Sequence, residues 1–223
     1  MRAVKETTFL GHYMTPEGIT PMRNKIDAVL KLGEPRNQTE VRSFIGAVTF
    51  YKSMWPGRSH VLAPLHQLTG VGRFFWGPDQ VRAFATMKAM IAADAMSYYP
   101  DLNKPFEIYT DASAYQLGAA IIQDGHPIAY WSKNLSDTQM KYNTTEKELL
   151  SIVLCMKEYH DILFGGRINV YTDHKNLTFN TLSAPRVMRW KMFLEQYDIN
   201  LTFVPGKTNV LADHPLYEIA RSE

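Results

Sequence analysis

The hydrophobic pattern of this chain changes its period near residue 100. Before that point apolar residues recur every three or four positions, as between residues 41 and 51, and this spacing is typical of amphipathic helices. Beyond it, apolar segments of strand length alternate with helical ones. We therefore expect a mostly helical segment, residues 1–100, followed by an α/β domain, residues 101–223. The proline-flanked stretch 100–105 is the expected boundary.

Four helical segments are expected in the first part from their apolar spacing and start signals. They lie after Pro21, after Asn37, between His60 and Leu68, and after Pro78. The second is predicted to begin with a capping box, in which the side chains of Asn37 and Glu40 satisfy each other's backbone N–H groups. The fourth is expected to bury Val81, Phe84, Met87, Met90 and Ile91.

The order of elements in the second part restricts its topology. Strands are expected at 106–110, 117–122, 127–131, 168–172 and 199–203, with a helix from Asn143 or Thr145 to about Leu163, a helix at 185–197 and a short one near Asn209. Gln123-Asp124-Gly125 is a hairpin turn between the second and third strands. Three meandering strands followed by helix-linked strands predict a mixed five-stranded sheet flanked by helices.

Composition narrows the class of protein. No apolar run approaches the roughly 20 residues that a membrane span requires, and the N-terminus lacks the apolar core of a secretory signal. The single cysteine, Cys155, excludes an internal disulfide and a cysteine-based zinc cluster. These features predict an intracellular protein without a membrane partner.

The net charge of +2 combines two unlike parts. Residues 1–100 carry 12 Lys and Arg against 7 Asp and Glu, whereas residues 101–223 carry 12 against 15. A basic part suits a polyanionic partner, and an acidic part binds nucleic acid only where cations occupy some of its carboxylates. Two solvated surfaces of chance composition explain the same numbers, so charge alone leaves both interpretations open.

Three acidic residues of the second part are predicted to meet in space. Asp111 and Asp173 stand at the C-terminal ends of strands that the order places side by side, where open α/β sheets hold their sites. Glu148 shares a helix face with Ile152 and Met156, so its side chain points at the sheet. Individually, each acid has an ordinary explanation as a turn residue or a complement to a helix dipole. Together, with no Lys or Arg as an evident partner, they favour hard divalent cations.

Longer motifs around these acids resemble a known family. They are Tyr109-Thr-Asp-Ala-Ser113, Thr145-Glu-Lys-Glu-Leu-Leu-Ser-Ile-Val153, Tyr171-Thr-Asp-His174 and Pro205-Gly-Lys-Thr-Asn-Val-Leu-Ala-Asp213. Together they resemble the ribonuclease H domain of a gypsy-type LTR-retrotransposon reverse transcriptase. Upstream, Phe9-Leu-Gly-His12 resembles the end of the palm, Val41-Arg-Ser-Phe-Ile-Gly46 the thumb, and Phe75-Trp76 the connecting region. The resemblance covers nearly the whole chain and implies a ribonuclease H-like fold for residues 101–223, preceded by a thumb and connection-like segment.

The resemblance also implies a metal-dependent endonuclease that hydrolyses the RNA strand of RNA–DNA hybrids. Its catalytic and metal-ligating residues would be Asp111, Glu148, Asp173 and Asp213, holding two Mg²⁺ ions for which Mn²⁺ can substitute. Glu146 competes for the role of Glu148 but is better interpreted as a capping acid paired with Asn143. The residues expected to contact the nucleic acid are Ser113, Lys133, Thr145, Arg186 and Arg189. For the two arginines, a solvated helix face is an equal alternative.

Two departures from the family limit what the resemblance implies. The chain has no Tyr-x-Asp-Asp sequence and lacks the fingers and most of the palm, so it is not expected to polymerise DNA by itself. The missing polymerase portion of a polyprotein, or a second copy of the chain, is an expected partner. Asp213 is followed by His-Pro-Leu-Tyr instead of the family's Ala-Leu-Ser-Arg, and Pro215 would disturb a helix there. An inert nucleic-acid-binding remnant is therefore one alternative to the enzyme, and another nuclease on the same fold is a second.

Overall fold

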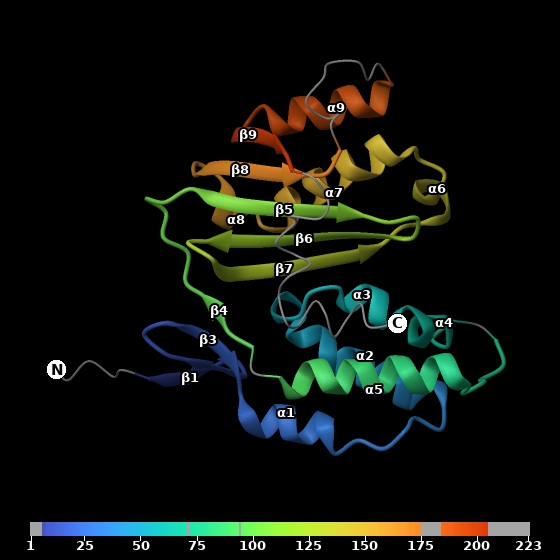
Figure 1. The fold of residues 1–223 in the computed structure, drawn as a ribbon. Coiled ribbons are helices and arrows are strands. Elements are labelled where there is room, and N and C mark those ends of the chain that lie inside the picture. Colours follow the sequence, from blue (N-terminus) through green and yellow to red (C-terminus); the bar gives the residue numbers. More distant parts are fainter. Residues whose placement is uncertain (1–5, 71, 94, 175–183, 205–223) are drawn as a thin grey trace. The chain divides into compact units, whose positions relative to one another are not determined.

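The computed structural model describes residues 6–70, 72–93, 95–174 and 184–204. These residues form two compact units that divide between Tyr99 and Pro100 (Figure 1). Unit 1 comprises the described residues up to Tyr99, and unit 2 those from Pro100 onward. Within these ranges, no helix is both long enough and apolar enough to cross a membrane.

Unit 1 contains a small antiparallel sheet that the hydrophobic pattern did not predict. Its strands are, in spatial order, β1 (Thr7–Phe9), β2 (His12–Met14), β3 (Gly18–Pro21) and β4 (Ser97–Tyr98). Each strand has only two to four residues. That length is too short for an alternating pattern to stand out in a sequence. The segment expected to be mostly helical therefore also contains a sheet, formed by three strands from its beginning and one from its end.

The expected helices of unit 1 are present. They are α1 (Arg23–Leu30), α2 (Gln38–Phe50), the 3₁₀ helix η1 (Lys52–Met54), α3 (Arg58–Val61), α4 (Ala63–Gln67) and α5 (Pro78–Ala92). At the start of α2, the Asn37 side chain accepts the backbone N–H of Glu40 at 2.9 Å. The Glu40 carboxylate, however, accepts the backbone N–H of Arg36 at 2.8 Å instead of that of Asn37. One of the two hydrogen bonds of the predicted capping box therefore forms, and the other is replaced by a bond to the residue before the cap.

The buried face of α5 corrects one expected core position. Val81 is 38% exposed, whereas Ala83 and Phe84 are buried. At 3.6 residues per turn, Val81 lies about 120° around the helix from the centre of the buried stripe that ends at Ile91. The remaining predicted positions of this helix are buried.

Unit 2 is built on a mixed five-stranded sheet with the order β7-β6-β5-β8-β9 (Figure 1). Its strands are β5 (Phe106–Ala112), β6 (Gln116–Gln123), β7 (His126–Asn134), β8 (Arg167–Thr172) and β9 (Asp198–Phe203). The first three form an antiparallel meander. β8 pairs in parallel with β5, and β9 in parallel with β8. This is the topology that the order of elements predicted.

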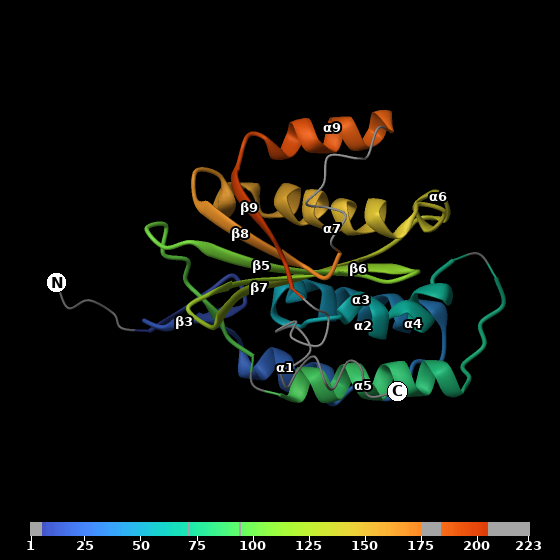
Figure 2. The same ribbon diagram turned by 45° about the horizontal axis from the view of Figure 1, so that its top comes forward.

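Helices cover one face of this sheet. They are α6 (Asp137–Met140), α7 (Thr144–Glu158), α8 (His160–Leu163) and α9 (Pro185–Leu194). α7 lies along the sheet and α9 lies over α7 (Figure 2). The Ser151 hydroxyl of α7 is fully buried and donates to the Gly118 carbonyl of β6 at 2.9 Å, which fixes the helix on the sheet. Asn143 caps α7, and the expected single helix to Leu163 is interrupted at Tyr159.

The β6–β7 hairpin turns at the expected residues. Asp124 and Gly125 both have positive φ angles, of 51° and 78°. Two consecutive left-handed residues are typical of the type I′ turn that joins twisted strands.

We expect Gly125→Ala to lower the free energy of unfolding by about 1 kcal/mol, because an L residue is strained in this conformation. An added Cβ at Gly125 would meet no described atom within 4 Å, so backbone strain is the main cost. Gly33→Ala is the control, since its Cβ is equally unobstructed and its φ is not left-handed. Denaturant unfolding measures both variants, and equal losses would contradict the assignment of strain to the turn.

Candidate active site

The pairing of β5 with β8 brings Asp111 and Asp173 to the same end of the sheet. The two strands run parallel, and Tyr109 stands opposite Tyr171. Their rings stack with centroids 4.7 Å apart. Continuing this register by two residues places Asp111 level with Asp173, which follows directly after β8. Asp111 is partly buried and Asp173 is exposed, so the two carboxylates line an edge that solvent reaches.

Glu148 approaches the same edge from α7. It is only 2% exposed. Its Oε1 atom accepts the backbone N–H of Ala112, the residue after Asp111, at 3.1 Å. Its Oε2 atom is buried and has no hydrogen-bond partner among the described residues. A buried carboxylate oxygen in this state costs free energy unless a ligand supplies the missing partner.

The three carboxylates affect one another electrostatically. Burial, together with the negative charges of Asp173 and Asp111, raises the pKa of Glu148 from 4.5 to about 8, although the hydrogen bond from the Ala112 N–H acts in the opposite direction. A divalent cation would offset both the burial and the repulsion. This donor set of carboxylate oxygens fits a hard cation such as Mg²⁺.

The described side chains do not close around an ion. Among them, no three His, Cys, Asp or Glu residues are grouped tightly enough to hold a metal. The fourth predicted ligand, Asp213, lies outside the described residues. The structure therefore brings Asp111, Glu148 and Asp173 to one region of unit 2 without arranging them as a complete ligand set.

Glu146 has the capping role that the sequence indicated. Its Oε2 atom accepts the Asn143 backbone N–H at 3.1 Å, and the Asn143 side chain accepts the Glu146 backbone N–H at 2.8 Å. Two residues before Glu148, this carboxylate is thus occupied at the start of α7. It is not available at the edge where Asp111 and Asp173 lie.

Four of the predicted nucleic-acid contacts have different surroundings. The Ser113 hydroxyl accepts the backbone N–H groups of Tyr115 and Gln116, so it shapes the β5–β6 connection. The Thr145 hydroxyl lies 2.7 Å from Nε2 of His174. Lys133 at the end of β7 and Arg189 on α9 are exposed. Only these last two present an exposed positive charge.

Arg186, the fifth predicted contact, faces the protein. Its Nη2 and Nε atoms lie 2.7 and 2.9 Å from Oε1 of Glu146. Its guanidinium carbon lies 4.3 Å from the centroid of the Tyr142 ring. The sequence showed Arg186 and Arg189 as equivalent residues on one helix, but only the structure separates their environments.

Lys147 is a further residue near the site that sequence reasoning missed. It is 9% exposed, and its Nζ donates to the Ala114 carbonyl at 3.2 Å. This bond ties α7 to the connection that follows Asp111. The spacing of apolar residues in a helix does not predict that Lys147 is buried, because lysine is ordinarily exposed.

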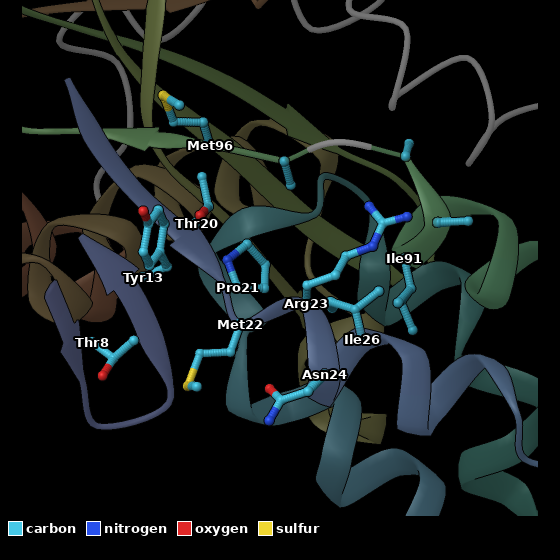
Figure 3. Close-up of a pocket in the computed structure, with 13 residues that line it drawn as sticks. Thr8, Tyr13, Thr20, Pro21, Met22, Arg23, Asn24, Ile26, Ile91 and Met96 are labelled. Carbon is cyan, nitrogen blue, oxygen red and sulfur yellow. The ribbon is translucent and has the colours of Figure 1, made fainter. Parts of the chain in front are cut away.

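One of the cavities in unit 1 differs from this site in its lining. It measures about 690 Å³ and is lined by residues of the small sheet, α1 and α5, including Tyr13, Arg23 and Met96 (Figure 3). Its described lining contains no Asp, Glu or His. It therefore offers no alternative carboxylate site.

Comparison with known proteins agrees with this topology. Residues 101–197 match the family described as the RNase H-like domain found in reverse transcriptase. The chain is 34% identical over 216 residues to the retrovirus-related Pol polyprotein from transposon 297 of Drosophila melanogaster, covering 94% of this chain and 20% of that protein. It is 29% identical over 221 residues to the transposon Tf2-3 polyprotein of Schizosaccharomyces pombe, covering 93% and 17% respectively. The chain thus spans about a fifth of the length of these relatives.

A solved structure shares the fold. The foamy viral protease-reverse transcriptase in complex with RNA/DNA hybrid matches with a TM-score of 0.77 and 22% identity, covering 91% of this chain and 29% of that one. Unit 2 therefore has the ribonuclease H-like fold, with the helical segment of unit 1 before it. Both features were expected from the sequence.

Without divalent metal, the stability of unit 2 should fall as the pH rises. The raised pKa of Glu148 means that the folded protein holds this proton more tightly than the unfolded chain. The resulting stabilisation is complete below the unfolded pKa, and it is lost as the pH rises through the folded value of about 8. In chelator, Glu148→Gln should therefore lose less stability than the wild type between roughly pH 5 and pH 9.

Thermal unfolding across this range measures the difference. Glu195→Gln serves as the control, because Glu195 is exposed beyond the end of α9 and its variant should follow the wild-type curve. Parallel curves for the wild type and Glu148→Gln would show that Glu148 carries no raised pKa.

Proposed function

We propose that the RNase H-like domain of this chain hydrolyses the RNA strand of RNA–DNA hybrids in a metal-dependent reaction, as part of a longer retrotransposon polyprotein. The observation that carries the proposal is the buried Oε2 atom of Glu148. It has no hydrogen-bond partner within the described parts of the chain, and the negative charges of Asp111 and Asp173 repel the Glu148 carboxylate. A bound cation is the simplest partner for this oxygen.

Asp111, Glu148 and Asp173 are the proposed ligands, with Asp213 as the fourth. Two Mg²⁺ ions at such a site would activate the attacking water and stabilise the leaving oxygen. The protein's own part is to hold the carboxylates and to orient the hybrid. The Ala112 N–H fixes one oxygen of Glu148, and the other oxygen, which has no hydrogen-bond partner among the described residues, is the proposed cation ligand.

The substrate is proposed from chemistry and from similarity. The foamy viral neighbour was solved with an RNA/DNA hybrid, and the family match is to a domain of reverse transcriptase. Only an RNA strand offers the 2′-hydroxyl that distinguishes it from DNA. Lys133 and Arg189 are the proposed phosphate contacts, because both are exposed. The polymerase portion of the polyprotein is a proposed partner.

An inert hybrid-binding remnant is the second candidate. It is favoured by the lack of a closed group of three metal-binding side chains among the described residues. Binding of the hybrid without cleavage, at any concentration of Mg²⁺ or Mn²⁺, distinguishes this candidate from the enzyme.

Cleavage of a labelled RNA–DNA hybrid tests the proposed enzyme. Activity should require Mg²⁺ or Mn²⁺, and Asp173→Asn should lower it at least roughly 100-fold, because a ligand charge is lost while the shape is kept. Asp198→Asn is the matched control: Asp198 is an exposed aspartate at the start of β9, and its variant should cleave normally. Undiminished cleavage in chelator, or by Asp173→Asn, would contradict the proposal.

A further inference from the structure

We infer that Arg186 is a positioning residue, which holds the first turn of α7, and with it Glu148, through an ion pair with the buried Glu146, and is not a phosphate contact. This inference rests on the proposed function for its meaning, since Glu148 is a proposed ligand. Its geometry lies entirely within unit 2.

The ion pair joins two helices at a buried carboxylate. The Glu146 side chain is 5% exposed, whereas that of Arg186 is 42% exposed. Both contacting guanidinium nitrogens are directed at the same oxygen, Oε1, at 2.7 and 2.9 Å. The other oxygen accepts the Asn143 N–H at the cap of α7. Removal of the arginine would leave a buried negative charge with only the helix cap to stabilise it.

The flat face of the guanidinium is used as well. Arg186 lies over the Tyr142 ring at 4.3 Å, and Trp190, one turn further along α9, contacts the same ring with centroids 5.9 Å apart. Tyr142 directly precedes the cap residue Asn143. Two residues of α9 thus hold the segment from which α7 begins. Lysine has neither two N–H groups fixed in one plane nor the flat guanidinium that stacks on a ring, and these contacts require both.

The first turns of α7 are fixed from the opposite side by the sheet. Glu148 accepts the Ala112 N–H, and Lys147 donates to the Ala114 carbonyl. α9 and β5 therefore hold the same short stretch of helix between them. A shift of α7 toward or away from α9 would move the Glu148 carboxylate relative to Asp111 and Asp173.

Arg189 provides the matched control on the same helix. It lies three residues after Arg186 and is exposed. If both arginines bound phosphates, their substitution would have the same consequence. We expect different consequences, because the donors and the planar face of Arg186 are directed at Glu146 and Tyr142.

The test compares Arg186→Gln, Arg186→Lys, Glu146→Gln, Arg189→Gln and the double variant of Arg186→Gln with Glu146→Gln, all in the full chain. Five quantities are measured: kcat and KM for hybrid cleavage, Mn²⁺ affinity by calorimetry, the salt dependence of hybrid affinity, and thermal unfolding. Arg186→Gln should lower kcat and Mn²⁺ affinity roughly tenfold, because the first turn of α7 would no longer hold Glu148 in place. Its salt slope should stay that of the wild type.

The other variants sharpen the comparison. Glu146→Gln should reproduce the loss of Mn²⁺ affinity. The double variant should bind Mn²⁺ as tightly as the single variant with the lower affinity, because both substitutions remove the same interaction. Arg186→Lys should retain only part of the wild-type kcat and Mn²⁺ affinity, since a single ammonium group replaces the planar guanidinium. Arg189→Gln should keep Mn²⁺ affinity, but it should weaken hybrid binding and reduce the salt slope by about one unit.

Two results would overturn the inference. One is a salt slope for Arg186→Gln that falls by about one unit with Mn²⁺ affinity unchanged. The other is full function in Arg186→Lys, as a simple phosphate contact allows. If Arg186→Gln does not fold, Arg186→Lys and Glu146→Gln still give these readouts. If the wild type fails to cleave, the proposed function fails, while Mn²⁺ affinity and the salt slope still decide the role of Arg186.

Discussion

The burial of one carboxylate, Glu148, is the constraint around which unit 2 is organised. A carboxylate that is 2% exposed beside two further negative charges is costly in a folded protein. The Ala112 N–H satisfies one of its oxygens, and the described surroundings offer the other no hydrogen bond. Stability alone would favour an apolar residue here. The proposed cation would complete the site and offset this cost.

The fold supplies the means to maintain this arrangement. The parallel pairing of β5 with β8 sets the two aspartates at one edge, and α7 packs on β5 and β6. Contacts from the sheet and from α9 meet at the first turns of α7. Asp111 and Glu148 therefore stand on regular elements, which position functional groups more rigidly than loops do, and Asp173 directly follows a strand.

Sequence patterns predicted much of this structure, and the misses have physical causes. The five strands of unit 2 and the Asn143 cap followed from periodicity and capping chemistry. The small sheet of unit 1 did not, because its strands are too short to show a period. The opposite environments of Arg186 and Arg189 depend on how α9 packs on α7, which residue spacing within one helix cannot reveal. The same limit hid Lys147, whose buried amine depends on a carbonyl that lies 33 residues away along the chain.

We propose that Asp111, Glu148 and Asp173 share a cation through the buried oxygen of Glu148. The most direct measurement is the anomalous scattering of crystals of the full chain soaked in Mn²⁺. We expect an anomalous peak roughly 2.0–2.2 Å from carboxylate oxygens of all three residues, with Oε2 of Glu148 as one ligand. Crystals in which Mn²⁺ binds elsewhere while these carboxylates remain unliganded at saturating metal would contradict it.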